Sequence, residues 1–209
     1  MPRFQLLIAV IEFAATLAFA LSGFIEAARR RMDVVGVFAV AFITAFGGGT
    51  VRDVLLDRRP FFWVEHQAHV WLIFLLSLAA VPWLRARHHH FTERAILVPD
   101  ALGLGLFTVT GVSLAWDAGM PVFVSAMMGV ITGVFGGVMR DVICNEVPFV
   151  FRDHRPYALC AFVGAWAYLG MNALDVTPLV SLGVAVLLIA GLRLLAVLTG
   201  WSVPGWRED

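Results

Sequence analysis

The 209-residue chain is 60% hydrophobic and only 14% charged, and its mean hydropathy is +0.86. Ordinary soluble domains have roughly 45–50% apolar and about 25% charged residues, so a soluble globular fold is excluded because water cannot accommodate this much apolar surface. All fifteen basic residues are arginine and the formal net charge is zero, which leaves no basic footprint for nucleic acid.

Apolar stretches long enough to cross a bilayer occur seven times along the chain. A transmembrane helix needs about 20 predominantly apolar residues. The sequence therefore predicts an all-α polytopic membrane protein, a single membrane domain over residues 1–209, with spans at 5–28, 34–56, 67–84, 95–116, 120–143, 156–174 and 177–199. The last span contains one charged residue, Arg193, close enough to its end for the side chain to reach the interface.

Arginine placement predicts the orientation of the chain, because cytoplasmic loops carry an excess of basic residues. An outside N-terminus puts nine arginines on the cytoplasmic side, and only Arg3, Arg58 and Arg59 on the other. The nine are Arg29, Arg30, Arg31, Arg85, Arg87, Arg94, Arg152, Arg155 and Arg207. The N-terminus is therefore expected outside and the C-terminus in the cytoplasm.

The chain contains an internal repeat. The segment TAFGGGTVRDVLLDRRPF at 44–61 matches TGVFGGVMRDVICNEVPF at 132–149, an offset of 88 residues. The aligned pairs are Gly48 and Gly136, Gly49 and Gly137, Arg52 and Arg140, Asp53 and Asp141, Pro60 and Pro148, and Phe61 and Phe149. At the same offset Glu12 aligns with Asp100, Phe19 with Phe107, Ser22 with Thr110, Gly23 with Gly111 and Thr44 with Thr132. Such self-similarity indicates a duplicated structural unit.

Each repeat, at 5–84 and at 95–174, contains three predicted spans. Because three is an odd number, the second unit enters the membrane from the opposite side, and the two are related by a pseudo-two-fold axis in the membrane plane. The fold predicted from sequence is two inverted three-helix repeats plus a seventh helix at 177–199. Inverted repeats place their solute path near the midplane, between the two units.

Glycine runs interrupt the second and fifth spans at corresponding positions, as Gly47, Gly48 and Gly49 and then as Gly136 and Gly137. Glycine costs roughly 1 kcal/mol relative to alanine in a helix interior, so a run of glycines favours a kink or a break. Backbone groups freed by a break must meet protein or a water-filled cavity. Close packing of helices is the alternative use of small residues. The arginines that follow favour a broken helix that lines a path.

Charged residues follow these glycines in both repeats, toward the ends of the second and fifth spans. Charged side chains within a membrane normally face the bundle interior and pair. Adjacent residues on a helix do not face each other, so the pseudo-symmetry suggests crossed pairs, Arg52 with Asp141 and Arg140 with Asp53. These pairs are either a structural clamp or a gate that moves.

Two further groups of polar residues lie inside the predicted spans. Glu12 and Asp100 are carboxylates deep in the first helix of each repeat, where they attract cations or balance the arginines. The hydroxyl groups either replace part of an ion's hydration or bond to their own helix backbone. They belong to Ser22, Thr110, Thr44 and Thr132.

The sequence contains no motif typical of an enzyme or of a bound cofactor. There is no G-x-S-x-G, H-E-x-x-H or phosphate-binding loop. The consecutive His88, His89 and His90 lack the spaced partners of a metal site, so we expect a solvated loop there. No cofactor, metal or catalytic activity is therefore predicted.

The doubled GGG-x-x-RD and GG-x-x-RD motifs, each followed by a proline, resemble those of the prokaryotic TRIC (trimeric intracellular cation) channels, a family also described by its glycine-transporter-like domains. The resemblance covers residues 5–199 and implies a homotrimer in the bacterial inner membrane, with a path for potassium and sodium ions through each protomer. It further implies that the glycines bend the second and fifth helices and that Arg52 and Arg140 lie near the path. Phe135 stands where the first repeat has Gly47, so the second bend is expected to be smaller.

Three functions remain open at this point. A monovalent cation channel is favoured by the family resemblance and by the mid-span carboxylates. A secondary transporter for a small metabolite such as glycine fits the inverted repeat equally, because an arginine in the path suits a carboxylate-bearing solute. A membrane scaffold, in which the glycines and ion pairs only lock helices together, is the third.

Overall fold

The computed structural model describes residues 2–87, 94–152 and 156–202, and within these ranges every regular element is an α-helix. The helices are α1 (Pro2–Arg29), α2 (Val34–Leu55), α3 (Phe62–Glu65), α4 (Gln67–Arg87), α5 (Arg94–Asp117), α6 (Val122–Ile143), α7 (Phe149–Arg152), α8 (Ala158–Ala173) and α9 (Pro178–Thr199). Seven long helices coincide with the seven apolar stretches of the sequence, and α3 and α7 are single turns between them. The predicted loop at His88, His89 and His90 lies outside the described residues.

Five of these helices are long and apolar enough to cross a membrane, namely α1, α2, α5, α6 and α9. The apolar parts of the other two long helices are shorter, Gln67–Ala79 in α4 and Ala158–Ala173 in α8. Large apolar side chains point outward from the bundle. On α9, for example, Leu187 is 73% and Leu198 83% exposed. Exposed apolar surface of this kind requires lipid or another chain, so the structure is that of a membrane protein.

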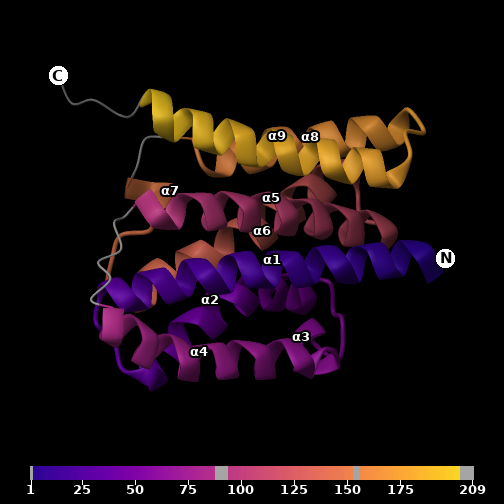
Figure 1. The fold of residues 1–209 in the computed structure, drawn as a ribbon. Helices are drawn as coiled ribbons and strands as arrows, with labels where there is room; N and C mark the ends of the chain where they lie inside the picture. Colours follow the sequence, from indigo (N-terminus) through magenta and orange to yellow (C-terminus); the bar gives the residue numbers. More distant parts are fainter. Residues whose placement is uncertain (1, 88–93, 153–155, 203–209) are drawn as a thin grey trace.

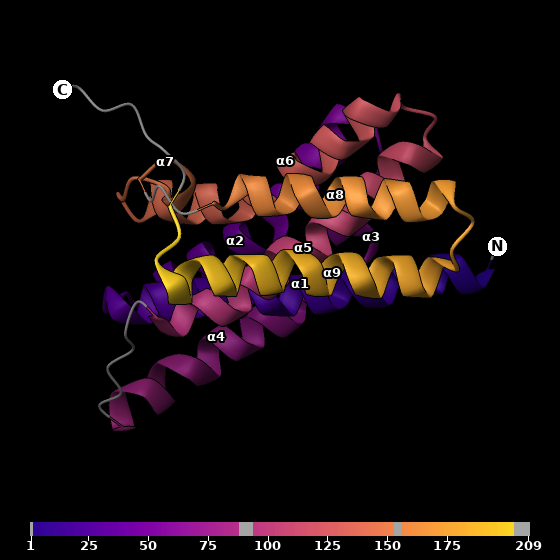
Figure 2. The same cartoon turned by 90° about the horizontal axis from the view of Figure 1, so that it is seen from above.

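Four helices form the centre of the bundle. The most extensive helix contacts join α1 to α2, α2 to α6, α6 to α5 and α5 back to α1, which closes a ring. Outside the ring, α4 packs on α2 and α1, while α8 packs on α6 and α5 and is joined by α9. Figure 1 shows this order, with α3 and α4 on one side and α8 and α9 on the other. In Figure 2, α4 and α6 cross the direction of α8 and α9 at a clear angle.

The turns that end these helices recur along the chain at the offset of 88 residues. Asp57 follows α2 with φ 50°, and Asn145 follows α6 with φ 55°. Arg31 follows α1 with φ 53°, and Gly119 follows α5 with φ 76°. A left-handed residue lets the chain reverse while its amides bond back to the last helical carbonyls. The first two long helices of each half therefore end in the same kind of left-handed turn.

The short helices lie at opposite ends of the bundle. Figure 1 shows α3 beside the N-terminal part of α1 and α7 near the C-terminal part of α1. Because α3 follows α2 and α7 follows α6, the C-terminal ends of α2 and α6 also lie at opposite ends. The two Arg-Asp pairs are thereby separated along the length of the bundle.

Candidate functional site

The first ion cluster, here called the Arg52 cluster, consists of Arg52, Asp53 and Glu12. The Arg52 guanidinium donates through Nε to Asp53 Oδ1 at 2.9 Å and through Nη1 to Glu12 Oε1 at 2.7 Å. The other oxygen of Asp53 accepts the backbone N–H of Phe62 at 2.9 Å. Arg52 is fully buried, and Glu12 is 6% exposed.

The second cluster, here called the Arg140 cluster, consists of Arg140, Asp141 and Asp100. Arg140 donates to Asp141 Oδ1 at 2.9 Å and to Asp100 Oδ1 at 2.7 Å. Asp141 Oδ2 accepts the backbone N–H of Phe149 at 3.0 Å. These bonds repeat those of the Arg52 cluster. Arg140 also donates to the Ser22 hydroxyl of α1, whereas among the described residues Arg52 has no such hydroxyl partner.

The predicted crossed pairs, Arg52 with Asp141 and Arg140 with Asp53, are wrong. Each arginine instead bonds to the aspartate that follows it and to the acid on the first helix of its own repeat. The rule that neighbours on a helix face apart applies to short side chains. An arginine stem is long enough to fold back along the helix end, so its Nε reaches the adjacent carboxylate.

The backbone amide that holds each aspartate comes from the turn after the proline that recurs in both repeats, Pro60 and Pro148. It belongs to Phe62 in the first half and to Phe149 in the second, and each ring also lies near the guanidinium, at 5.3 Å and 5.6 Å from Cζ to the ring centroid. The sequence alignment had paired Phe61 with Phe149. The first loop is one residue longer than the second, so the structural counterpart of Phe149 is Phe62.

The glycines serve close helix packing rather than a helix break. Both α2 and α6 are continuous through their glycine runs, so the expected break is absent. A Cβ on Gly48 would lie 2.0 Å from the backbone oxygen of Thr132, and a Cβ on Gly136 would lie 2.6 Å from the backbone oxygen of Thr44. The two helices approach each other so closely here that only glycine fits.

Three of the four predicted hydroxyls bond to their own helices. Thr44 donates to the Val40 carbonyl and Thr132 to the Met128 carbonyl, each at 2.6 Å, and Thr110 donates to Leu106 and Phe107. This is the usual role of hydroxyls in membrane helices. Ser22 differs, because its oxygen accepts from Arg140 of the other repeat.

An aromatic contact fills the centre of the helix ring and was not predicted as part of the site. The rings of Phe19 and Phe107 stack with centroids 5.4 Å apart, and both are fully buried. Phe19 also lies against the backbone positions of Gly103 and Gly136. In the sequence, only the alignment of Phe19 with Phe107 at the repeat offset pointed to this contact.

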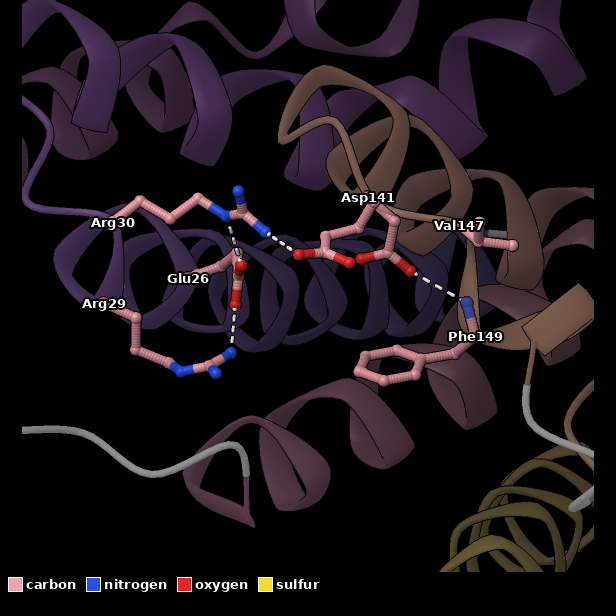
Figure 3. Close-up of a pocket in the computed structure, with 7 residues that line it drawn as sticks. Glu26, Arg29, Arg30, Asp141, Val147 and Phe149 are labelled. Atoms are coloured by element: carbon pink, nitrogen blue, oxygen red, sulfur yellow. Dashed lines mark hydrogen bonds and ion pairs between the residues drawn. The ribbon is translucent and has the colours of Figure 1, made fainter.

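A small cavity of about 30 Å³ opens beside the Arg140 cluster, with Asp141 and Phe149 on one side (Figure 3). Arg30 crosses it, donating to Glu26 at 2.7 Å and to Glu146 at 2.5 Å. Its hydrogen bond with Glu26 raises the pKa of the Arg30 guanidinium above its ordinary value. The Arg30–Glu146 bond thus joins the end of α1 to the turn after α6, across the outer side of the cavity.

Arg193, whose side chain was expected to extend toward the membrane interface, is buried inside the bundle. Its side chain is 2% exposed and its guanidinium lies over the Tyr157 ring, 4.8 Å from the centroid. Within the part of the chain that the structure describes, no three His, Cys, Asp or Glu side chains are placed to hold a metal ion.

Buried ion clusters of this kind are strongly interdependent. Removing one partner of a buried pair costs about 3–5 kcal/mol because an uncompensated charge remains. In both clusters the two carboxylates share one guanidinium, and a backbone amide holds the aspartate in place. The arrangement ties the end of α2 to α1 and to the start of α3, and the end of α6 to α5 and to the start of α7, and it concentrates negative charge at two points along the bundle.

Comparison with known protein families gives two matches along the chain. The family described as glycine transporter matches residues 9–85 and again residues 97–173. The UPF0126 inner membrane protein YadS of Escherichia coli is 36% identical over 154 residues, which are 74% of this chain and 73% of that protein. A UPF0126 membrane protein of Vibrio cholerae is 37% identical over 158 residues, 76% of this chain and 65% of the relative.

Solved structures of TRIC cation channels share this fold. The TRIC trimeric intracellular cation channel orthologue from Rhodobacter sphaeroides is 32% identical, with a TM-score of 0.83 over 93% of this chain and 98% of its own. A TRIC cation channel whose structure addresses conductance is 34% identical, with a TM-score of 0.83 over 96% of this chain and 98% of its own.

Proposed function

This chain belongs to the membrane-protein family described as glycine transporter, together with the prokaryotic TRIC channels, and from that premise we propose that it is a channel for potassium and sodium ions. The structural likeness to TRIC cation channels over nearly the whole chain is the observation that carries the proposal. The bacterial inner membrane is the proposed location, since the relative in Escherichia coli is an inner membrane protein.

The proposed architecture is seven transmembrane helices, with α1, α2 and α4 as one unit, α5, α6 and α8 as its inverted copy, and α9 as the seventh. Support comes from the double family match, from the turns that recur at the repeat offset and from the ion clusters at opposite ends of the bundle. The N-terminus is proposed outside and the C-terminus inside, and each protomer of a homotrimer has its own path.

The path is proposed to run along the contact between α2 and α6, from the Arg52 cluster to the Arg140 cluster. Each cluster has two carboxylates for one arginine, which favours cations over anions. The stacked rings of Phe19 and Phe107 and the glycine contact of Gly48 with Thr132 close this route in the structure. Conduction therefore requires α2 and α6 to separate, and the ion clusters at their ends are placed to control that movement.

Transport of glycine is the second candidate, motivated by the description of the family. The geometry of the proposed path favours it less, because the arginine of each cluster is already bonded to two protein carboxylates. A scaffold without transport is the third candidate.

Potassium flux into liposomes containing the purified protein separates the three. We expect selective flux in the wild type, reduced in Glu12→Gln and Asp100→Asn because each change removes a negative charge beside the path. Glu65→Gln, which alters an exposed carboxylate, is the control and should conduct like the wild type. Absent flux with concentrative glycine uptake supports the transporter, and absence of both supports the scaffold.

A further inference from the structure

The two ion clusters carry the same net charge but are balanced by different arginines. With its carboxylates ionised, each cluster has one more negative than positive charge. A net charge held inside a membrane protein requires a counter-charge nearby. The nature of that counter-charge decides how each end of the bundle interacts with a cation.

At the Arg52 cluster the additional arginine is Arg58, on the turn after α2. Its Nη1 lies 3.7 Å from Asp53 Oδ1, and its side chain is 42% exposed. An exposed pair at this distance is weak, and dissolved salt screens it further. The negative charge of this cluster is therefore only partly neutralised.

The half-buried arginines at the other end, Arg29 and Arg30, bond to glutamates instead. Arg30 bonds to both Glu26 and Glu146, and Arg29 bonds to Glu26 at 2.7 Å (Figure 3). Both arginines are therefore engaged by glutamates. A buried arginine is the better candidate for the counter-charge of the Arg140 cluster.

Among the arginines whose side chains the structure describes, Arg193 on α9 is the buried one that lies outside the two clusters. It is 2% exposed, its Nη1 has no hydrogen-bond partner, and the described residues place no carboxylate within ion-pair distance of it. The face of the Tyr157 ring, at 4.8 Å from Cζ, is its observed contact. An aromatic face attracts a cation but supplies no negative charge, so Arg193 still carries a full positive charge inside the bundle.

Tyr157 connects Arg193 to the Arg140 cluster. The Tyr157 hydroxyl and Asp100 Oδ1 lie 3.1 Å and 3.5 Å from the same point, the position that a Cβ on Gly137 would occupy. Tyr157 is 4% exposed, and its hydroxyl makes no hydrogen bond of good geometry to the described residues. The ring therefore faces Arg193 while the hydroxyl faces the space beside Asp100.

We propose that Arg193 is the buried counter-charge of the Arg140 cluster, placed there through Tyr157, and that it makes this end of the ion path less attractive to cations than the Arg52 end. This inference rests on the proposed channel function. Dissolved salt screens the exposed Arg58 at the Arg52 end, whereas the buried Arg193 at the Arg140 end is shielded from salt. Cations therefore enter more readily from the Arg52 end, and the current rectifies.

Single-channel recording in excised patches of giant spheroplasts, where all channels share one orientation, tests the rectification. Arg193→Gln should raise the current of cations entering from the Arg140 end by about two- to tenfold, the range expected for one charge at an effective dielectric between those of water and the protein interior. Arg58→Gln should raise the opposite current, and only at low salt, because the Debye length falls to about 3 Å at 1 M. Arg193→Lys keeps the charge and should rectify like the wild type.

Thermal unfolding of the purified protein tests the counter-charge independently of conduction. If Arg193 balances Asp100, the double variant Asp100→Asn with Arg193→Gln should melt about 2–4 °C or more above the value expected from adding the two single shifts. A matched cycle of Arg193→Gln with Glu26→Gln should be additive. Additive shifts in the first cycle, or unchanged rectification in Arg193→Gln, overturn the inference. If the wild type does not conduct but the melting-temperature shifts of Asp100→Asn and Arg193→Gln are coupled, the channel function is refuted and the charge pairing is supported.

Discussion

The substitution of Gly48 by alanine tests whether the repeated glycines serve close packing or helix flexibility. The new Cβ would lie 2.0 Å from the Thr132 backbone oxygen, 3.1 Å from its carbonyl carbon and 3.4 Å from the Gly136 nitrogen. All three atoms belong to the backbone of α6. No side chain can rotate away, so the contact is relieved only if α2 and α6 move apart.

The expected cost follows from that geometry. Overpacking a well-packed contact costs about 1–3 kcal/mol, and a collision with backbone belongs at the upper end. The higher helix propensity of alanine offsets up to about 1 kcal/mol of this destabilisation. A net loss of about 2 kcal/mol lowers the melting temperature of a protein of this size by about 4–8 °C.

Gly47, the neighbouring glycine, is the matched control. A Cβ there meets only the side chain of Met139, whose sulfur would be 2.6 Å away and can rotate. Gly47→Ala should therefore leave the melting temperature unchanged or raise it slightly, through helix propensity. Thermal unfolding of both variants in detergent gives the comparison. Equal destabilisation by the two substitutions would refute the packing argument and indicate that the glycines provide flexibility.

Arg140→Leu leaves two buried carboxylates without a partner and should destabilise the protein by about 3–5 kcal/mol in thermal unfolding, so a loss below about 1 kcal/mol contradicts the cluster's role. Phe107→Ala removes a ring that closes the centre of the bundle and should increase potassium flux; unchanged flux places the closure elsewhere. Burial raises the pKa of the Cys144 thiol, which lowers its thiolate fraction, so maleimide should label it slowly at pH 7.5 in a Cys160→Ser background. Glu146→Ala removes the bond that ties the turn after α6, in which Cys144 also lies, to Arg30, so it should accelerate that labelling; an unchanged rate argues against a holding role for this bond.

The positions of the long helices followed from the sequence because they depend on a local property. A run of about 20 apolar residues has one stable solvent, lipid, and within lipid the backbone must satisfy its own hydrogen bonds by forming a helix. The same local character made the recurring residues visible, so Arg52, Glu12, Arg140 and Asp100 could be named before their contacts were known.

Tertiary structure alone decided which of these residues meet. The crossed pairs failed because an arginine can fold back onto the aspartate beside it, a choice that depends on where the first helix of each repeat places Glu12 or Asp100. The sequence shows that Arg193 lies within the last span but not what it contacts. Its position over Tyr157 results from the packing of α9 on its neighbours. Gly48 likewise has two uses that the sequence cannot separate. Its role is fixed by the distance between α2 and α6, which no local pattern encodes.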